Sequence, residues 1–175
     1  MDLDPRLHFV TATAIVVRNR KVSDGERSRT MNVLEFLIAK RASHEKAFPN
    51  KWTVPGGKLV RTEYETLPKR SYADGQKESD APQWYYIIEW LVKKEVLEEV
   101  NVEVEKPQYL TDLVFIRPDG YPVITLSYWC MYKSGEAKPG KDLTEVAWVT
   151  VEEAKKYDLI EGIWEEIRDV GKLVE

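Results

Sequence analysis

Short apolar runs alternate with polar turns along most of this chain, a pattern typical of a protein with several strands. The runs that predict strands are rich in β-branched and aromatic residues and lie at 9–17, 32–39, 52–54, 108–116, 122–132 and 146–149. The polar segment Ser23–Ser28 separates the first two runs and predicts a hairpin with a long tip. Arg117–Gly120, which contains Pro and Gly, predicts a tight turn between two later strands.

One long helix is predicted in the middle of the chain. Asp80 can cap it, Pro82 suits its first turn, and Gln83 stands three residues after Asp80, as in a capping box. The helix should run to about Val100, where Asn101 can adopt the left-handed conformation that closes a helix. The polar residues before it, 64–80, predict an insertion loop.

Two shorter helices are predicted near the C-terminus. Thr150 and Glu153 form a second capping-box pattern that opens one of them, and residues 160–170 form the other. Several strands with one central helix and C-terminal helices indicate an α/β fold, in which a mixed sheet is packed between helices. The length of 175 residues fits a single domain over 1–175.

Three carboxylates in the central helix are the first sign of chemistry. Glu95, Glu98 and Glu99 stand at i, i+3 and i+4, so a helix places them on one face, where like charges repel. Lys93 and Lys94 are expected to point mostly to other sides of the helix. A hard divalent cation would resolve the repulsion. The alternative is an ordinary solvated helix face.

The phase of the helix favours the metal interpretation. At about 100° per residue, the three glutamates continue an apolar stripe. The members of that stripe are Trp84, Ile88, Leu91 and Val92, and the opposite side carries Tyr86, Trp90 and Leu97. The helix is therefore expected to be covered on two faces, where unpaired carboxylates are costly.

Composition and charge exclude several classes of protein. A net charge of −4 gives no electrostatic footprint for nucleic acid or for an anionic membrane, so neither is expected as a partner. The single cysteine, Cys130, excludes an internal disulfide framework and is expected to be a buried thiol. No apolar run is long enough for a membrane span, and the acidic N-terminus lacks a signal-peptide core, so a cytoplasmic protein is expected.

The glycines and the glutamates together resemble a family signature. Gly57–Glu63 followed by Lys94–Val102 resembles the motif G-x5-E-x7-R-E-U-x-E-E-x-G-U of Nudix hydrolases, where U is a bulky aliphatic residue. The segments Leu37–Arg41 and Lys51–Lys58 are similar to the lead-in of such domains, and Glu145–Val149 to their last strand. The resemblance spans nearly the whole chain and implies a Nudix-type α/β/α sandwich.

Three departures from that motif stand out. Glu63 and Lys94 are 31 positions apart where the pattern has 8, so 23 residues are inserted, and the role of Glu63 stays open. Lys94 replaces an arginine that resembles an orienting partner for the glutamates; it keeps the charge but loses the bidentate fork. Asn101 replaces a glycine, a mild change at a left-handed cap.

The resemblance implies a hydrolase that cleaves the pyrophosphate of a nucleoside diphosphate linked to another group, such as a nucleotide, an ADP-ribose-like compound or a sugar nucleotide. Mg²⁺ or Mn²⁺ would be bound by the residues Glu95, Glu98, Glu99 and the carbonyl of Gly57. Glu98 is the first candidate for the catalytic base, with Glu95 next, and Asp142 or Glu145 on a loop as alternatives.

Several basic residues near the glycines are candidates for substrate recognition. Arg41, Lys58 and Arg61 flank the glycines and are candidates for binding phosphates, as is Glu145 for other contacts to the substrate. Gly56 and Gly57 allow either a close backbone approach or a left-handed turn. The 64–80 insertion is expected to shape the substrate site or a homodimer contact.

Two alternatives stay open. One is a non-catalytic Nudix-like domain that senses a nucleotide, although a pure binder has no need of three converging carboxylates. The other is an isomerase of isoprenoid diphosphates, which would need a reactive cysteine, and Cys130 is the only candidate. His8 and His44 are too few for a histidine-rich zinc site.

Overall fold

The computed structural model describes residues 4, 6–24, 29–69 and 82–174. The strands are β1 (Phe9–Asp24), β2 (Arg29–Arg41), β3 (Trp52–Thr53), β4 (Gly56–Lys58), β5 (Val102–Val104), β6 (Gln108–Ile116), β7 (Pro122–Gly135) and β8 (Leu143–Val149). The helices are α1 (Arg61–Tyr64), α2 (Ile87–Val100), α3 (Val151–Ala154) and α4 (Ile163–Val174).

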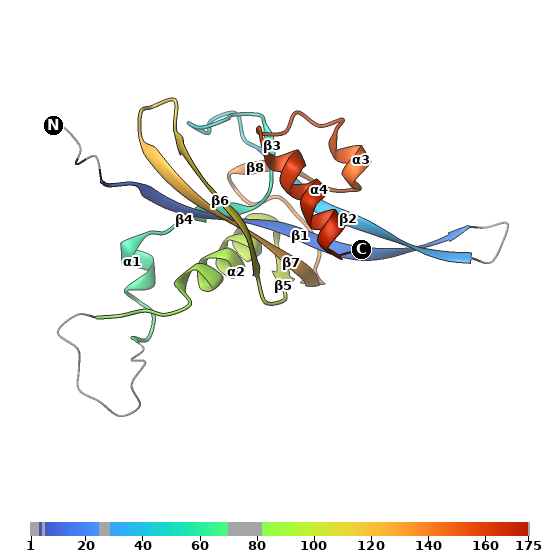
Figure 1. Ribbon diagram of the computed structural model, residues 1–175, viewed down its shortest axis with the longest axis horizontal. Helices are drawn as coiled ribbons and strands as arrows, with labels where there is room; N and C mark the ends of the chain where they lie inside the picture. The colour runs from blue at the N-terminus through green and yellow to red at the C-terminus, as the bar shows by residue number, and fades with distance from the viewer. Residues whose placement is uncertain (1–3, 5, 25–28, 70–81, 175) are drawn as a thin grey trace.

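The eight strands form one mixed sheet. Its main order is β3-β2-β1-β7-β5, with β4 beside β1, β6 beside β7 and β8 beside β2. The central pair β1–β7 is parallel, whereas β1–β2, β2–β8 and β6–β7 are antiparallel. The long β1–β2 ribbon extends beyond the helices at the right of Figure 1.

Helices cover both faces of the sheet (Figure 1), because the side chains of its central strands alternate. On one face, Ala12, Ala14 and Val16 pack with Leu91 and Val96 of α2. The opposite face packs against α4 through a second buried cluster, which includes Ile15, Val17, Phe36, Ile163 and Ile167. The α/β/α sandwich with a mixed sheet is therefore confirmed.

The central helix begins later than predicted. α2 begins at Ile87 rather than near Asp80, and its N-cap is Tyr86 in a left-handed conformation with no side-chain cap. Asp80 lies outside the described residues, and Gln83 precedes the helix, so no capping box opens it at residue 80. At the other end Asn101 is left-handed, with a φ of 57°, as predicted.

One face of α2 is less covered than the sequence suggested. Leu91, Val92 and Val96 are buried as expected, but Tyr86 is 65% exposed and Leu97 is 50% exposed. The expectation that the helix is covered on two faces is therefore wrong, since only the face toward the sheet is buried. Trp84 of the predicted stripe stands before the helix.

The remaining elements differ from the predictions mainly at their ends. β6 keeps the predicted bounds, and Thr150 and Glu153 form the predicted capping box at α3. α4 begins and ends a few residues later than expected, and β4 and β5 were not predicted. The tip of the first hairpin, 25–28, and residues 70–80 of the insertion lie outside the described residues. No helix among the described residues is long and apolar enough to cross a membrane.

Candidate metal centre

Lys94 lies at the centre of the acidic cluster. Its Nζ is 3.0 Å from Glu95 Oε1, 3.1 Å from Glu98 Oε2 and 3.2 Å from Glu63 Oε2. The expectation that Lys94 points away from the glutamates is therefore wrong, because its long stem carries the ammonium group back across the helix face. The neighbouring Lys93 does point elsewhere and pairs with Glu89 at 2.7 Å.

The ion pair with Glu63 rejoins the two halves of the split motif. Glu63 belongs to α1, and the inserted residues separate it from α2 in sequence. The two ends of the insertion are held together by Tyr64 and Trp84, whose rings pack edge to face with centroids 5.2 Å apart. Trp84 Nε1 also donates to the carbonyl of Leu67 at 3.2 Å. Glu63 thus reaches the glutamates of α2 although its spacing in the sequence is lost.

Gly56 and Gly57 bring the backbone of β4 against the same carboxylates. Gly56 N donates to Glu99 Oε2 at 2.9 Å. A Cβ added at Gly57 would lie 2.2 Å from Glu95 Cδ, so the carboxylate occupies the space that a side chain would need. Both glycines are in a strand paired with β1. Their requirement is close approach rather than a left-handed turn.

Burial raises the pKa of two of the carboxyl groups. Desolvation raises the pKa of Glu99 to about 7, although the bond from Gly56 N and the charge of Arg41 act in the opposite direction. Desolvation also raises the pKa of Glu95, opposed by Lys94 and assisted by Glu98 and Glu63. For Lys94, burial lowers the pKa, but its bonds to the glutamates outweigh this and leave it raised. The charged forms of Glu95 and Glu99 are therefore costly in the metal-free protein.

A second group of polar residues lies beside Glu99. Asp142 raises and Arg41 lowers the pKa of Glu99, so both are close enough to act on it electrostatically. Ligand atoms of His44, Glu45 and Asp142 lie within 4.8 Å of one another. The distance from His44 Nε2 to Asp142 Oδ1 is 3.6 Å.

The motif pointed neither to Glu45 nor to the meeting of His44 with Asp142. His44 lies in a turn with its side chain 64% exposed, and Glu45 has no place in the motif. Nearly a hundred positions separate them from Asp142, and the contact arises because Ala42 N bonds the carbonyl of Asp142 at 3.0 Å. Glu45 also forms an ion pair with Arg41, across a turn that no helical spacing predicts.

Other candidate residues are not part of the glutamate cluster. Glu145 Oε1 is held by Lys40 Nζ at 2.7 Å, across the pairing of β2 with β8. Arg61 is 80% exposed and pairs with Glu65. Lys58 is exposed, and its Nζ lies 6.0 Å from the centre of the Phe9 ring. These three side chains therefore make their contacts away from Lys94 and its partners.

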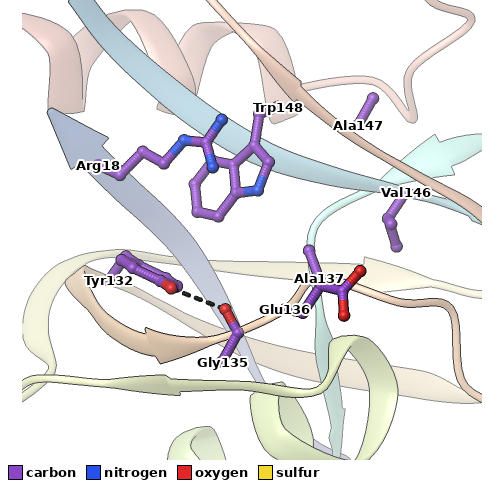
Figure 2. Close-up of a pocket in the computed structure, with 8 residues that line it drawn as sticks. All are labelled: Arg18, Tyr132, Gly135, Glu136, Ala137, Val146, Ala147 and Trp148. Atoms are coloured by element: carbon purple, nitrogen blue, oxygen red, sulfur yellow. Dashed lines mark hydrogen bonds between the residues drawn. The ribbon is translucent and has the colours of Figure 1, made fainter. Parts of the chain in front are cut away.

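A hollow of about 350 Å³ lies between β1, β7 and β8 (Figure 2). Arg18 crosses the indole face of Trp148, with its guanidinium carbon 4.1 Å from the ring centre. Tyr132 donates its hydroxyl to the carbonyl of Gly135 at 2.7 Å. Glu136 also lines the hollow, but the four carboxylates around Lys94 and Gly56 do not. The aromatic face offered by Trp148 is thus already covered by a cation.

Cys130 is fully buried in β7. Desolvation raises the pKa of its thiol to about 12, so it stays protonated at neutral pH. The thiol is the expected core residue. An isomerase that depends on a reactive cysteine is not supported.

Solved structures with a similar fold come from Nudix proteins. The chain superposes on a MutT protein from Methanosarcina mazei Go1 with a TM-score of 0.63, at 17% identity over 99% of both chains. It superposes on the Nudix domain of Shewanella oneidensis NrtR, complexed with ADP ribose, with a TM-score of 0.66, at 16% identity over 99% of this chain and 95% of that one. For a Caenorhabditis elegans Ap4A hydrolase the TM-score is 0.59, at 16% identity over 95% and 97%.

No protein-family model matches the chain, and no curated protein matches it. The structural likenesses, at such low identity, concern the fold. They confirm the Nudix fold that the motif resemblance implied.

Proposed function

We propose that this chain, which has the Nudix fold, is a divalent-metal-dependent hydrolase that cleaves the pyrophosphate of a nucleoside diphosphate linked to another group. The observation that carries the proposal is the convergence of Glu63, Glu95 and Glu98 on Lys94, with Gly57 pressed against Glu95. A solvated helix face would not bring a distant carboxylate and a glycine strand to the same point.

The residues present fit a hard cation such as Mg²⁺ or Mn²⁺. Four carboxylates, those of Glu63, Glu95, Glu98 and Glu99, surround a site that contains one lysine. Burial disfavours the charge of Glu95 and Glu99, so a divalent cation with oxygen ligands would relieve both the repulsion in the cluster and the desolvation of these two groups. The carboxylates of Glu95, Glu98 and Glu99 and the carbonyl of Gly57 would hold it.

When bound, the cation would neutralise charge on the diphosphate and lower the pKa of a water molecule. Glu98 would accept the proton of the attacking water at its carboxylate. It is 60% exposed, whereas Glu95 is 13% exposed, so Glu98 is the more open to water and substrate. Lys94 would fix the orientation of both carboxylates through its ion pairs.

Among the loop alternatives for the base, Asp142 is better placed than Glu145. Asp142 acts electrostatically on Glu99, whereas Glu145 is engaged by Lys40. Arg41 is the best candidate for a phosphate contact because its charge also acts on Glu99; its guanidinium is held by Glu45 and by the carbonyl of Ala47. Lys58 and Arg61 would need to turn from their present partners to meet a phosphate.

The Nudix neighbours and the charge of the site support the proposed substrate class. One neighbour is complexed with ADP ribose and another is an Ap4A hydrolase, so both are associated with nucleoside diphosphate derivatives. An acidic site with bound divalent cations suits such polyanions. We infer a small nucleoside diphosphate derivative as the substrate.

The test is a hydrolysis screen. Wild type, Glu98→Gln and Glu105→Gln are assayed on nucleoside triphosphates, ADP-ribose, sugar nucleotides and dinucleoside polyphosphates, with Mg²⁺ and with Mn²⁺. Glu105 is an exposed residue after β5, so its variant is the matched control. We expect cleavage by wild type and the control, and a loss of about 100-fold or more in Glu98→Gln, typical of a missing general base.

The screen also separates the catalytic proposal from a nucleotide-sensing domain. A sensor would bind one of these compounds with no turnover under either metal, and that outcome would end the hydrolase proposal. Equal turnover in Glu98→Gln and wild type would instead remove Glu98 from its role.

A further inference from the structure

A second hollow, of about 580 Å³, lies at the N-terminal end of α2. This α2 hollow is lined by the aromatic side chains Trp84, Tyr86 and Trp90, by Lys106, and by Lys93 paired with Glu89 at 2.7 Å. Its volume falls in the range of small-molecule pockets, about 300–1,000 Å³. Aromatic rings with nearby cations are the chemistry that binds a flat ring attached to an anion.

The walls of the α2 hollow come from the two ends of the motif insertion. Leu67 and Pro68 stand at one end, and Trp84 at the other. The bond from Trp84 Nε1 to the Leu67 carbonyl joins them. The insertion therefore builds a defined cavity at its base.

The α2 hollow lies on the side of α2 away from Glu95, and the side chain of Lys94 connects it to the glutamate cluster. Trp90 lines it, and Lys94 Nζ lies 5.9 Å from the centre of the Trp90 ring. The same ammonium group pairs with Glu98. Trp90 and Glu98 are eight residues apart, or about 12 Å along a helix. A ribose and an extended diphosphate can bridge that interval.

The aromatic surface here is open. Tyr86 is 65% exposed, and Leu97, on the same side of α2, is 50% exposed. The indole of Trp148 in the other hollow is instead covered by Arg18. Of the two hollows, the one at α2 offers uncovered aromatic surface to a ligand.

We propose that the α2 hollow binds a nucleobase-type aromatic ring of the substrate, with the diphosphate extending from it toward Glu98. The inference rests on the proposed function and adds a location for the base. The inserted segment then has a role in substrate choice, since both of its ends form this cavity.

The test compares two probes that resist hydrolysis, measured by calorimetry with Mg²⁺. The probes are α,β-methylene-ADP, which has a base, and methylenediphosphonate, which has none. Tyr86→Asn removes an exposed ring and keeps a residue that tolerates the left-handed backbone. We expect it to weaken α,β-methylene-ADP binding about tenfold, as one lost stack would, and to leave methylenediphosphonate binding unchanged.

Two further variants fix the location. Trp90→Leu should show the same selective loss, and it covers the case in which Tyr86→Asn is poorly folded. Tyr109→Thr changes an exposed tyrosine on β6 and should bind both probes like wild type. Trp148→Leu tests the other hollow and should also retain the preference for the nucleotide.

The outcomes keep the two proposals apart. If wild type binds neither probe with Mg²⁺, the metal-dependent function fails, and the base site fails with it. If wild type prefers the nucleotide and the Tyr86 and Trp90 variants keep that preference, or Trp148→Leu loses it, the base binds elsewhere. The assignment of the α2 hollow is then overturned while the hydrolase proposal stands.

Discussion

Replacing Lys94 with methionine should destabilise the metal-free protein. Methionine keeps an apolar stem of similar length beside Trp90 but removes the ammonium group that contacts Glu63, Glu95 and Glu98. Three carboxylates then face one another with no cation among them.

The magnitude follows from the exposure of each pair. The pair with Glu98 is 60% exposed on the glutamate side and should contribute like a surface ion pair, at most about 1 kcal/mol. The pair with Glu95 is more buried, at 20% and 13% exposed, and breaking a fully buried pair costs about 3–5 kcal/mol. Since the pair is only partly buried, we expect a total loss of about 2–3 kcal/mol in the free energy of unfolding.

Urea unfolding at pH 8, with EDTA and then with Mg²⁺, measures this loss. Mg²⁺ should stabilise Lys94→Met more than wild type, because the cation binds the folded cluster and neutralises it. Lys94→Arg keeps the charge and should lose less than Lys94→Met. Lys93→Met is the matched control, since Lys93 pairs with the partly buried Glu89 on the same helix and not with the glutamate cluster. Equal losses in Lys93→Met and Lys94→Met, with no difference in the effect of Mg²⁺, would refute the reasoning.

Three other predictions test the site and the fold. Gly57→Ala should reduce turnover at least tenfold with little loss of stability, because its Cβ would displace the carboxylate of Glu95. Gly56→Ala should instead lower the melting temperature, because its Cβ would meet the backbone of β1. The reverse result would contradict the assignment. Without metal, the free energy of unfolding should fall as the pH rises from about 4.5 to 7, because the pKa of Glu99 is raised in the folded state and the folded protein therefore binds more protons than the unfolded one. In urea titrations Glu99→Gln should flatten that fall. An unchanged slope would count against a raised pKa at Glu99. Asn101→Gly should leave the free energy of unfolding nearly unchanged and Asn101→Ala should lower it by about 1 kcal/mol, measured with the same urea assay, since the φ of 57° favours glycine and asparagine.

Much of the fold could be predicted from local patterns. β6 has the predicted bounds because its apolar run is closed at one end by Pro107 and at the other by the turn Arg117–Gly120. The capping box of Thr150 and Glu153 forms as expected, because both of its bonds join residues three positions apart. Signals that act over a few residues are legible in a sequence.

The start of α2 was predicted too early for a related reason. The capping pattern of Asp80, Pro82 and Gln83 is local, but the chain turns at Tyr86 and the helix begins only after it. Trp84 packs on Tyr64 just before the left-handed Tyr86, after which the helix begins at Ile87. A tertiary contact across the insertion cannot be found from the periodicity of the helix.

The candidate site divides in the same way. Glu95, Glu98 and Glu99 are legible because they lie within one turn of a helix. The position of Lys94 among them is not, since a helical wheel follows the Cα–Cβ direction and not the end of a long side chain. The meeting of His44 with Asp142 depends on the pairing of segments far apart in the sequence.

Binding of Mn²⁺, followed by electron paramagnetic resonance, tests the central claim most directly, because it needs no substrate. Wild type and Glu105→Gln should remove the signal of free Mn²⁺ with equal affinity, and Glu95→Gln should bind at least about tenfold more weakly, as expected on loss of a ligand. If wild type binds no Mn²⁺ at millimolar concentration, or if Glu95→Gln binds it as tightly as wild type, the glutamates of α2 are not the metal site.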